Sequence, residues 1–280
     1  MSAIEHASVM SPLVQYAAKG RIDLQVCPVN QKGFLDLDAL DDLLTGNTRL
    51  ISVMLANNEV GSIQPLSDVV VRAKTVGALV HSDIVQAVGK MPVNLEAIGA
   101  DAVTVSSHKC YAPTGWGALI VKHLDDISPM VLGGSQQQML RGGTVNVFGT
   151  VLFEKGLRYC YSELPKAVDI SSFVSKHLRK LPHIEIISAP DQPNQLWNTV
   201  SLAFKGVDAH DMLIRLDLEG IAVSSGSACS TGAVEVSSVI EAMGVSSDIA
   251  SSVIRMSFGY MTTQNDLDYL LNHINTPVKK

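Results

Sequence analysis

Cysteine is scarce in this chain, with four residues among 280. They are Cys27, Cys110, Cys160 and Cys229, and no two of them form a CxxC pair or share with histidines the spacing that zinc requires. A secreted domain stabilised by disulfides would contain cysteine at higher density. The sequence therefore predicts reduced, metal-free cysteines in a reducing compartment, and we expect a cytoplasmic protein.

Long hydrophobic runs and an excess of positive charge are also lacking. The longest apolar runs, such as residues 50–56, are too short to cross a bilayer, and the first ten residues have neither the basic start nor the apolar centre of a signal peptide. The formal net charge is −6 and the basic residues are scattered, which does not favour binding to a phosphate backbone or an anionic membrane. We expect no nucleic-acid or membrane partner.

Hydrophobic residues make up 46% of the chain and charged residues 17%, a balance typical of a folded globular protein. Over the first two thirds, short apolar or β-branched runs alternate with amphipathic segments. This alternation predicts a mostly parallel sheet covered by helices on both faces. The expected strands are 22–29, 50–55, 78–82, 102–106 and 118–122, and the expected helices are 36–44, 66–76 and 95–98.

The last third has a different pattern. A mainly helical segment over residues 147–181 contains Pro165, which should end or kink a helix. We therefore expect an α/β fold in two domains, with residues 1–150 forming the large one and residues 151–280 forming a linker helix and a smaller α+β domain. In the smaller domain the expected strands are 184–187, 199–204, 221–223 and 253–258, and the expected helices are 209–218 and 237–243.

Polar side chains follow three of the expected strands. Asn57 and Asn58 follow one, Asp83 follows the next, and Ser106 and Lys109 follow the third. Because open parallel sheets bind ligands at the carboxyl ends of their strands, these side chains meet in one crevice if the strands are neighbours. Singly, each has a simpler interpretation: an Asn-Asn turn, an aspartate that caps a helix, and a solvated lysine.

Together, these side chains match the needs of one cofactor. Pyridoxal 5′-phosphate (PLP) requires a lysine amine for its Schiff base, a carboxylate beside its pyridine nitrogen, donors for its phenolate oxygen and donors for its phosphate. The sequence offers Lys109, Asp83, Asn58 with Gln86, and Ser106 for these four needs. It therefore favours a PLP site.

Seven motifs support this interpretation. In chain order they are IEHASV, NNEVGSIQP, HSDIVQAVGKMPV, SSHKCYAPTGWGAL, GGSQQQMLRGGTVNV, AVSSGSACSTGAVE, and VIRMSFG followed by TTQNDLDYL. Their order and spacing closely resemble the NifS/IscS cysteine desulfurases, which are class V, fold-type I PLP enzymes. The resemblance implies the PLP-dependent transferase fold type I and the conversion of L-cysteine to L-alanine with sulfur transfer.

The resemblance also implies a role for each matching residue around the cofactor. Lys109 would form the Schiff base, and Asp83 would pair with the pyridinium nitrogen. Asn58 and Gln86 would contact the phenolate oxygen. His6, in the EH motif, would stack on the ring and assist proton transfer.

The resemblance also assigns residues to the phosphate group of PLP. Ser106 and His108 would help to hold it, and Thr144 resembles a residue that reaches the phosphate of the neighbouring subunit, which implies a homodimer. In the family, a glycine-threonine loop that cradles the phosphate precedes the EH motif. Here the EH motif contains His6 and stands almost at the start, so we expect this loop to be missing. Because such a loop is a major anion site, we expect weak PLP binding or dependence on another polypeptide.

The resemblance assigns substrate binding to Arg255 and sulfur transfer to Cys229. Arg255 resembles the arginine that binds the substrate carboxylate in a planar, bidentate pairing; the alternatives are a surface salt bridge and an exposed arginine on one strand face. Cys229 resembles the sulfur-accepting nucleophile, and the Ser/Gly-rich residues 224–232 give its loop the freedom to swing a thiol. The persulfide would then pass to a sulfur-acceptor or scaffold protein.

The sequence leaves three functions open. The first is a cysteine desulfurase, with selenocysteine lyase as a near variant, that serves iron-sulfur cluster assembly or thiolation. The second is a truncated homologue that is inactive or only binds a partner, as the missing phosphate loop suggests. The third is a class V aminotransferase that does not use Cys229, and replacing Cys229 with serine separates it from the first.

Overall fold

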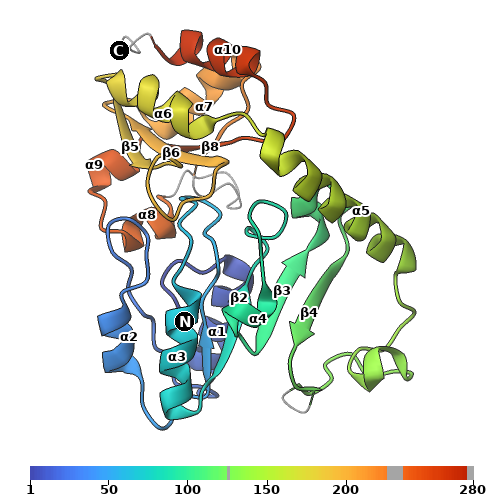
Figure 1. Cartoon of the computed structure of the whole chain (residues 1–280). Coiled ribbons are helices and arrows are strands. Elements are labelled where there is room, and N and C mark those ends of the chain that lie inside the picture. Colours follow the sequence, from blue (N-terminus) through green and yellow to red (C-terminus); the bar gives the residue numbers. More distant parts are fainter. Residues whose placement is uncertain (125–126, 226–235, 276–280) are drawn as a thin grey trace.

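Two four-stranded sheets organise the described part of the chain (Figure 1). The structure is a computed structural model that describes residues 1–124, 127–225 and 236–275. The first sheet has the strand order β1-β2-β3-β4, and the second has the order β5-β6-β8-β7. The chain therefore has an α/β fold.

The first sheet is mostly parallel, as the alternation of strands and helices predicts. β1, β2 and β3 run parallel to one another, whereas β4 pairs antiparallel with β3. Ser52 of β1 lies opposite His81 of β2, and His81 lies opposite Ala102 of β3. The strands are β1 (Leu50–Ser52), β2 (Leu79–Asp83), β3 (Ala102–Ser106) and β4 (Gly117–Val121).

Two helices, α1 and α2, precede the first sheet and two more, α3 and α4, connect its parallel strands; capping residues define where they begin and end. Asp36 accepts hydrogen bonds from the main-chain amides of Asp38 and Ala39, which starts α2. Gly77 ends α3 in the left-handed conformation, with φ 71°. These helices are α1 (Ala7–Ala18), α2 (Leu37–Leu43), α3 (Leu66–Val76) and α4 (Leu95–Ile98).

The long helix α5 (Val147–Glu163) links the two sheets, running diagonally from the first toward the second in Figure 1. It is followed by a short 3₁₀ helix at Leu164–Lys166 that contains Pro165, and then by α6 (Ile170–Lys176). Because proline cannot donate the hydrogen bond that would continue the helix, the prediction that Pro165 ends it is confirmed.

The second sheet is antiparallel; α6, α7 and α10 lie above it at the top of Figure 1, and α8 and α9 lie at the left and below it. Every residue of its strand β6 is buried. Its strands are β5 (Ile184–Ser188), β6 (Thr199–Phe204), β7 (Ser224–Ser225) and β8 (Val253–Ser257), and its helices include α7 (Ala209–Leu218), α8 (Ser238–Ala242), α9 (Ser247–Ala250) and α10 (Gln264–Ile274).

Each sheet has its own hydrophobic core. Ile51 and Val80 belong to the core of the first sheet, and Leu202 and Phe204 belong to the core of the second. A third cluster packs residues of α8 and α9 against the loop that follows β1. This third cluster holds the two sheets in a fixed relation to each other.

Two expected strands are wrong. Residues 22–29 pair only through isolated bridges, Ser2 with Cys27 and Val29 with Leu35, so they form no ladder. Residues 221–223 are not a strand either, because pairing with β8 begins at Ser224. In addition, the helices α1, α9 and α10 were not expected from the sequence.

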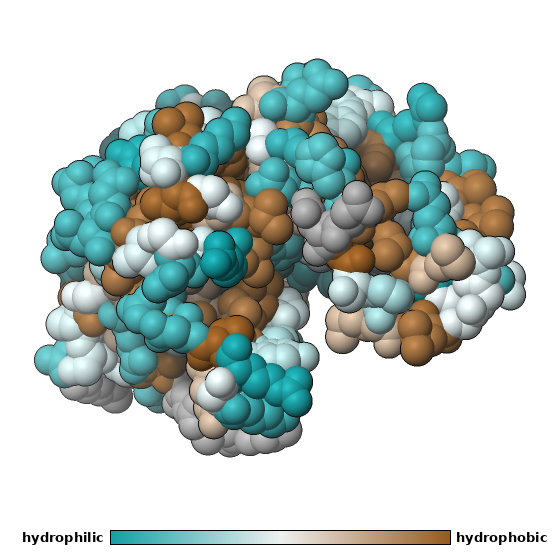
Figure 2. All heavy atoms as spheres, turned by 90° about the horizontal axis from the view of Figure 1, so that it is seen from below, coloured by the Kyte–Doolittle hydropathy of each residue, from teal (hydrophilic) through white to brown (hydrophobic). Residues whose placement is uncertain are grey.

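The surface carries both polar and apolar side chains. Figure 2, which views the molecule from below, shows hydrophobic residues exposed among hydrophilic ones. Among the helices that the structure describes, none has the length and apolar character needed to cross a membrane.

Candidate active site

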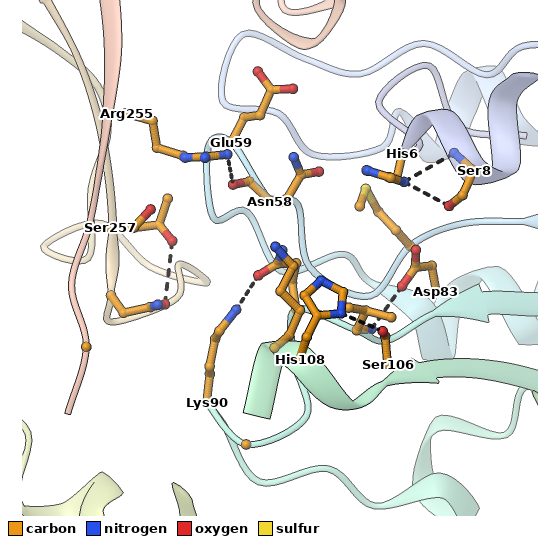
Figure 3. A pocket seen from close by; sticks show the side chains of 18 of the residues that line it. His6, Ser8, Asn58, Glu59, Asp83, Lys90, Ser106, His108, Arg255 and Ser257 are labelled. Carbon is orange, nitrogen blue, oxygen red and sulfur yellow. Dashed lines mark hydrogen bonds between the residues drawn. The ribbon is translucent and has the colours of Figure 1, made fainter. Parts of the chain in front are cut away.

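A cavity of about 870 Å³ contains most of the polar side chains that the sequence singled out. Its walls come from the start of α1, from the carboxyl ends of β1, β2 and β3, and from β8 of the second sheet (Figure 3). This volume is within the usual range for small-molecule sites. The predicted residues that line it are His6, Asn58, Asp83, Gln86, Ser106, His108, Lys109 and Arg255.

The order of the strands explains why three polar segments meet here. β1, β2 and β3 are adjacent and parallel, so their carboxyl ends lie at one edge of the sheet. Asn58, Asp83 and Ser106 follow or end these strands and line the cavity. The predicted crevice depended on these strands being neighbours, and they are.

The two adjacent asparagines have different positions. Asn57 is buried; its Nδ2 donates to the carbonyl oxygen of Ile4 at 3.0 Å, and its Oδ1 accepts from the amides of Glu59 and Val60. Asn57 therefore stabilises the turn. Asn58 lines the cavity, so the turn interpretation applies to only one residue of the pair.

Asp83 lies beside a second acidic group that is buried. Oδ1 of Asp83 accepts a hydrogen bond from the amide of Val85 at 2.9 Å. Nearby, Oε1 of Glu5 accepts from the amide of Met54 at 2.7 Å, while Oε2 of Glu5 is buried without a partner among the described residues. Burial, and then the charge of Asp83, raise the pKa of Glu5 to about 8. Glu5 is therefore mainly neutral at pH 7.

Lys109 follows β3 in a short 3₁₀ helix, Ser107–Cys110, and is exposed toward the cavity. Oγ of Ser106 lies 2.9 Å from Nδ1 of His108, which fixes the imidazole ring. Partial burial and the neighbouring Lys109 ammonium lower the pKa of His108, so its neutral form is favoured at pH 7. This segment therefore presents an amine, a hydroxyl and a neutral imidazole together.

His6 precedes α1 and caps it. Its Nδ1 accepts from the amide of Ser8 at 3.2 Å and lies 2.8 Å from the Ser8 hydroxyl. Nδ1 is therefore engaged by the helix start, and Nε2 is left for a ligand. In Figure 3, His6 and Asp83 lie on one side of the cavity and Arg255 lies on the other.

Arg255 reaches the cavity from β8. Its Nη1 donates to the carbonyl oxygen of Asn58 at 2.9 Å, and its Nε is buried without a partner among the described residues. The side chain is only partly exposed, and none of the ion pairs between described residues includes it. The alternative of an exposed arginine on a strand face is therefore wrong.

One predicted site residue is not among the described residues that line the cavity. Thr144 is exposed, in the segment before α5. Cys229 lies outside the described residues. The buried Cys27 and Cys110 have pKa values that burial raises to about 11 and about 12, so both thiols are protonated and unreactive at pH 7.

Other residues that line the cavity did not emerge from the sequence. They are Glu5, Glu59, Lys90, Trp197 and Tyr260, among others. A spacing of four residues between Gln86 and Lys90 is a signal for Lys90, because such residues share one face of a helical turn. The other four could be recognised only from the tertiary structure.

No group of three or more His, Cys, Asp or Glu side chains in the described ranges could hold a metal ion.

The family model for aminotransferase class-V matches residues 1–270. The chain therefore belongs to the aminotransferase class-V family, whose members share the fold-type I architecture seen here.

Curated proteins named cysteine desulfurase are among those similar to this chain. "Cysteine desulfurase IscS" of Dictyoglomus turgidum is 35% identical over 283 residues, which cover 100% of this chain and 71% of that protein. A solved structure titled "NIFS-LIKE PROTEIN" has a TM-score of 0.88 and 33% identity, covering 98% of this chain and 73% of that one. A second, "SspA in complex with cysteine", has a TM-score of 0.73 and 26% identity, covering 92% and 72%.

Proposed function

We propose that this chain is a PLP-dependent cysteine desulfurase, which converts L-cysteine to L-alanine and takes up the sulfur as a persulfide on Cys229. The observation that carries the proposal is the arrangement of Asn58, Asp83 and Lys109 at three adjacent strand ends, opposite Arg255. The names of the similar proteins support the same reaction, and one of them binds cysteine in its solved structure.

The chemistry of the cavity suits PLP. Lys109 offers an amine, Asp83 a carboxylate for the pyridine nitrogen, and Asn58 with Gln86 amide donors for the phenolate oxygen. Ser106 and His108 offer donors for the phosphate. Nε of Arg255 and Oε2 of Glu5 are buried without partners among the described residues, which supports a site for a polar ligand beside them. When bound, PLP supplies an electron sink that acidifies the α-proton of an amino acid.

The residues of the chain then divide the remaining tasks. Arg255 binds the substrate carboxylate through its guanidinium, and Lys109 takes the α-proton and returns a proton to carbon. The Cys229 thiolate attacks the sulfur of the substrate. A sulfur–sulfur bond forms, the carbon–sulfur bond breaks with its electron pair remaining on carbon, and protonation of that carbon gives alanine. The reaction balances without an external oxidant.

The decisive experiment combines absorbance with product assays. The purified protein is mixed with PLP and a thiol reductant, which releases sulfide from the persulfide, and its visible absorbance is recorded before and after addition of L-cysteine while sulfide and alanine are measured. We expect Lys109→Ala to abolish the visible band and Cys229→Ser to abolish sulfide release. Transamination that survives in Cys229→Ser would favour an aminotransferase. Absence of both band and sulfide in the unmodified protein would favour a binding-only homologue.

We also propose that the protein works as a homodimer. Thr144 is exposed outside the cavity, and large hydrophobic side chains in the surrounding segment are exposed as well: Met130 by 91%, Leu132 by 80% and Phe148 by 73%. Exposed apolar surface of this kind supports burial against a second copy. Sedimentation should show a dimer that Phe148→Glu dissociates, and Thr144→Ala should weaken PLP binding. A stable monomer that binds PLP fully would contradict this.

The persulfide must leave the protein for the cycle to continue. We propose that a sulfur-acceptor or scaffold protein in the cytoplasm takes it, for iron-sulfur cluster assembly or for thiolation. We propose as well that the chain divides near residue 150 into a large PLP-binding domain and a smaller domain. The separate hydrophobic cores of the two sheets support this division.

A further inference from the structure

Lys90 lines the cavity, although the proposed reaction assigns it no task. It lies four residues after Gln86 in the turn that follows β2, where the amides of Val88 and Met91 bond to the carbonyl oxygens of Ile84 and Ala87. The turn is therefore helical in character, and residues four apart share a face. Nζ of Lys90 donates a hydrogen bond to Oε1 of Gln86 (Figure 3).

The main chain that carries Lys90 is held firmly. Gly89 has φ 77°, and a Cβ at this position would lie 3.2 Å from the sulfur atoms of both Cys110 and Cys160. The Tyr260 hydroxyl, which follows the second sheet, donates to the carbonyl oxygen of Gly89. The peptide that precedes Lys90 is therefore fixed from both sheets, and the side chain reaches the cavity from a defined position.

The surroundings of Lys90 are unusual for a lysine. Burial, and then the positive charges of Lys109 and Arg255, lower its pKa to about 8, while Cys110 and Cys160 act in the opposite direction. No acidic side chain within the described ranges forms an ion pair with it. Its hydrogen-bond partner is a neutral amide.

A lysine ammonium can only donate hydrogen bonds, whereas a carboxamide has one accepting end and one donating end. When Lys90 engages Oε1 of Gln86, the Nε2 group of Gln86 must point elsewhere, and both side chains line the cavity. A hydroxyl group in place of the ammonium could accept as well as donate, so it would not select one orientation. The ammonium therefore determines which end of the Gln86 amide is available to a ligand.

We propose that Lys90 is a positioning residue, which holds the Gln86 carboxamide so that its Nε2 donates to the phenolate oxygen of PLP. This inference rests on the proposed function. A donor at the phenolate oxygen stabilises the form of the bound cofactor that has lost its Schiff-base proton. Removing that donor, together with a nearby positive charge, should make the bound cofactor hold its proton more tightly.

The test is a pH titration of the visible absorbance of the PLP-loaded protein. We expect Lys90→Met to raise the pH midpoint by about one unit and to weaken PLP binding several-fold. Gln86→Leu should raise the midpoint similarly. In the double variant, the two effects should add only in part, because both substitutions remove the same Lys90–Gln86 contact and only Lys90→Met also removes a positive charge. Lys90→Arg keeps a group that only donates and should restore the midpoint of the unmodified protein.

Two further variants keep the test decisive. Lys74→Met removes an exposed lysine of α3 and should leave both the midpoint and the PLP affinity unchanged. If Lys90→Met does not fold, Lys90→Gln is measured instead. Because its amide can both donate and accept, it does not select one orientation of the Gln86 amide, so the pH midpoint must still rise.

The inference is overturned if Lys90→Met leaves the midpoint unchanged, or if its effect adds fully to that of Gln86→Leu. If the unmodified protein shows no visible band with PLP, the proposed function fails instead.

Discussion

Nη1 of Arg255 lies 2.9 Å from the carbonyl oxygen of Asn58 and donates a hydrogen bond to it. This contact joins β8 of the second sheet to the loop that follows β1 of the first. It occupies one nitrogen of the guanidinium and sets its plane, while Nε remains buried without a partner among the described residues. The arginine is therefore oriented before a substrate arrives.

Arg255→Lys should raise the KM for L-cysteine by about 10- to 100-fold, because an ammonium cannot reproduce the bidentate pairing with a carboxylate. The measurement is a steady-state titration of sulfide release. Arg158→Lys, on the exposed face of α5, preserves an ion pair with Glu154 and should leave KM unchanged. An unchanged KM in Arg255→Lys would show that the substrate carboxylate binds elsewhere.

Glu5→Gln should stabilise the protein in a pH-dependent way. The pKa of Glu5 is raised from its ordinary value of 4.5 to about 8 by burial, so the folded state binds the proton more tightly than the unfolded state. Stability from this proton is complete below the ordinary value and is lost as pH rises toward about 8. The glutamine can still accept from Met54 and carries no titrating proton.

The melting temperature measures this effect. We expect the gain in Glu5→Gln to be absent near pH 4, to grow between pH 5 and 8, and to reach a few degrees. Glu154→Gln, at an exposed position, should show no such trend. A gain that is independent of pH would exclude titration of Glu5 as the cause.

Ser237→Ala should lower the free energy of unfolding by about 1–2 kcal/mol. Ser237 caps α8 by accepting from the amides of Val239 and Ile240, and its hydroxyl also donates to Glu59, on the loop that carries Asn58. Urea denaturation gives the value. Ser246 precedes α9 without a side-chain cap hydrogen bond, so Ser246→Ala should cost clearly less. Equal losses in both variants would contradict the assigned contacts.

Gly156→Ala should destabilise the protein by about 1–3 kcal/mol and weaken PLP binding. Gly156 faces the segment that carries Lys109, and an added Cβ would overlap the carbonyl oxygen of Cys110. Helix α5 would have to move away from the lysine segment. At Gly46 an added Cβ meets nothing within 4 Å, so Gly46→Ala is the control and should be close to neutral. Unchanged PLP affinity in Gly156→Ala would show that α5 does not position the lysine.

The sequence was sufficient for most strands and helices because their hydrophobic patterns are strong. α3, α4, β3, β6 and α7 begin and end where their patterns predict. The direction of a strand is harder to predict, because the apolar run of β4 would fit a parallel or an antiparallel strand equally well. In the structure, β4 is antiparallel to β3. Residues 22–29 look like a strand because apolar residues alternate with Asp23 and Gln25, but whether a strand forms depends on a neighbouring strand to pair with.

In the candidate site, too, some features could be predicted from the local sequence and others depend on tertiary structure. Local sequence places Asp83 and Lys109 after strands, and the neighbouring order of those strands brings them together. Glu5 and Tyr260 come from opposite ends of the chain, and only tertiary packing brings them to the cavity. The helix α1 escaped prediction because it contains Pro12 and has no buried residue, so its pattern lacks an apolar face directed at a core.

Of the two tryptophans in the chain, Trp197 lines the cavity, with its ring centroid 5.2 Å from that of Tyr260. Trp116 instead packs on Phe153, with centroids 4.6 Å apart, and does not line the cavity. The protein therefore contains an optical sensor beside the ligand position and a reference fluorophore away from it. A chromophore that enters the cavity will quench the emission of Trp197 more strongly than that of Trp116, so occupancy can be followed by fluorescence without any added label.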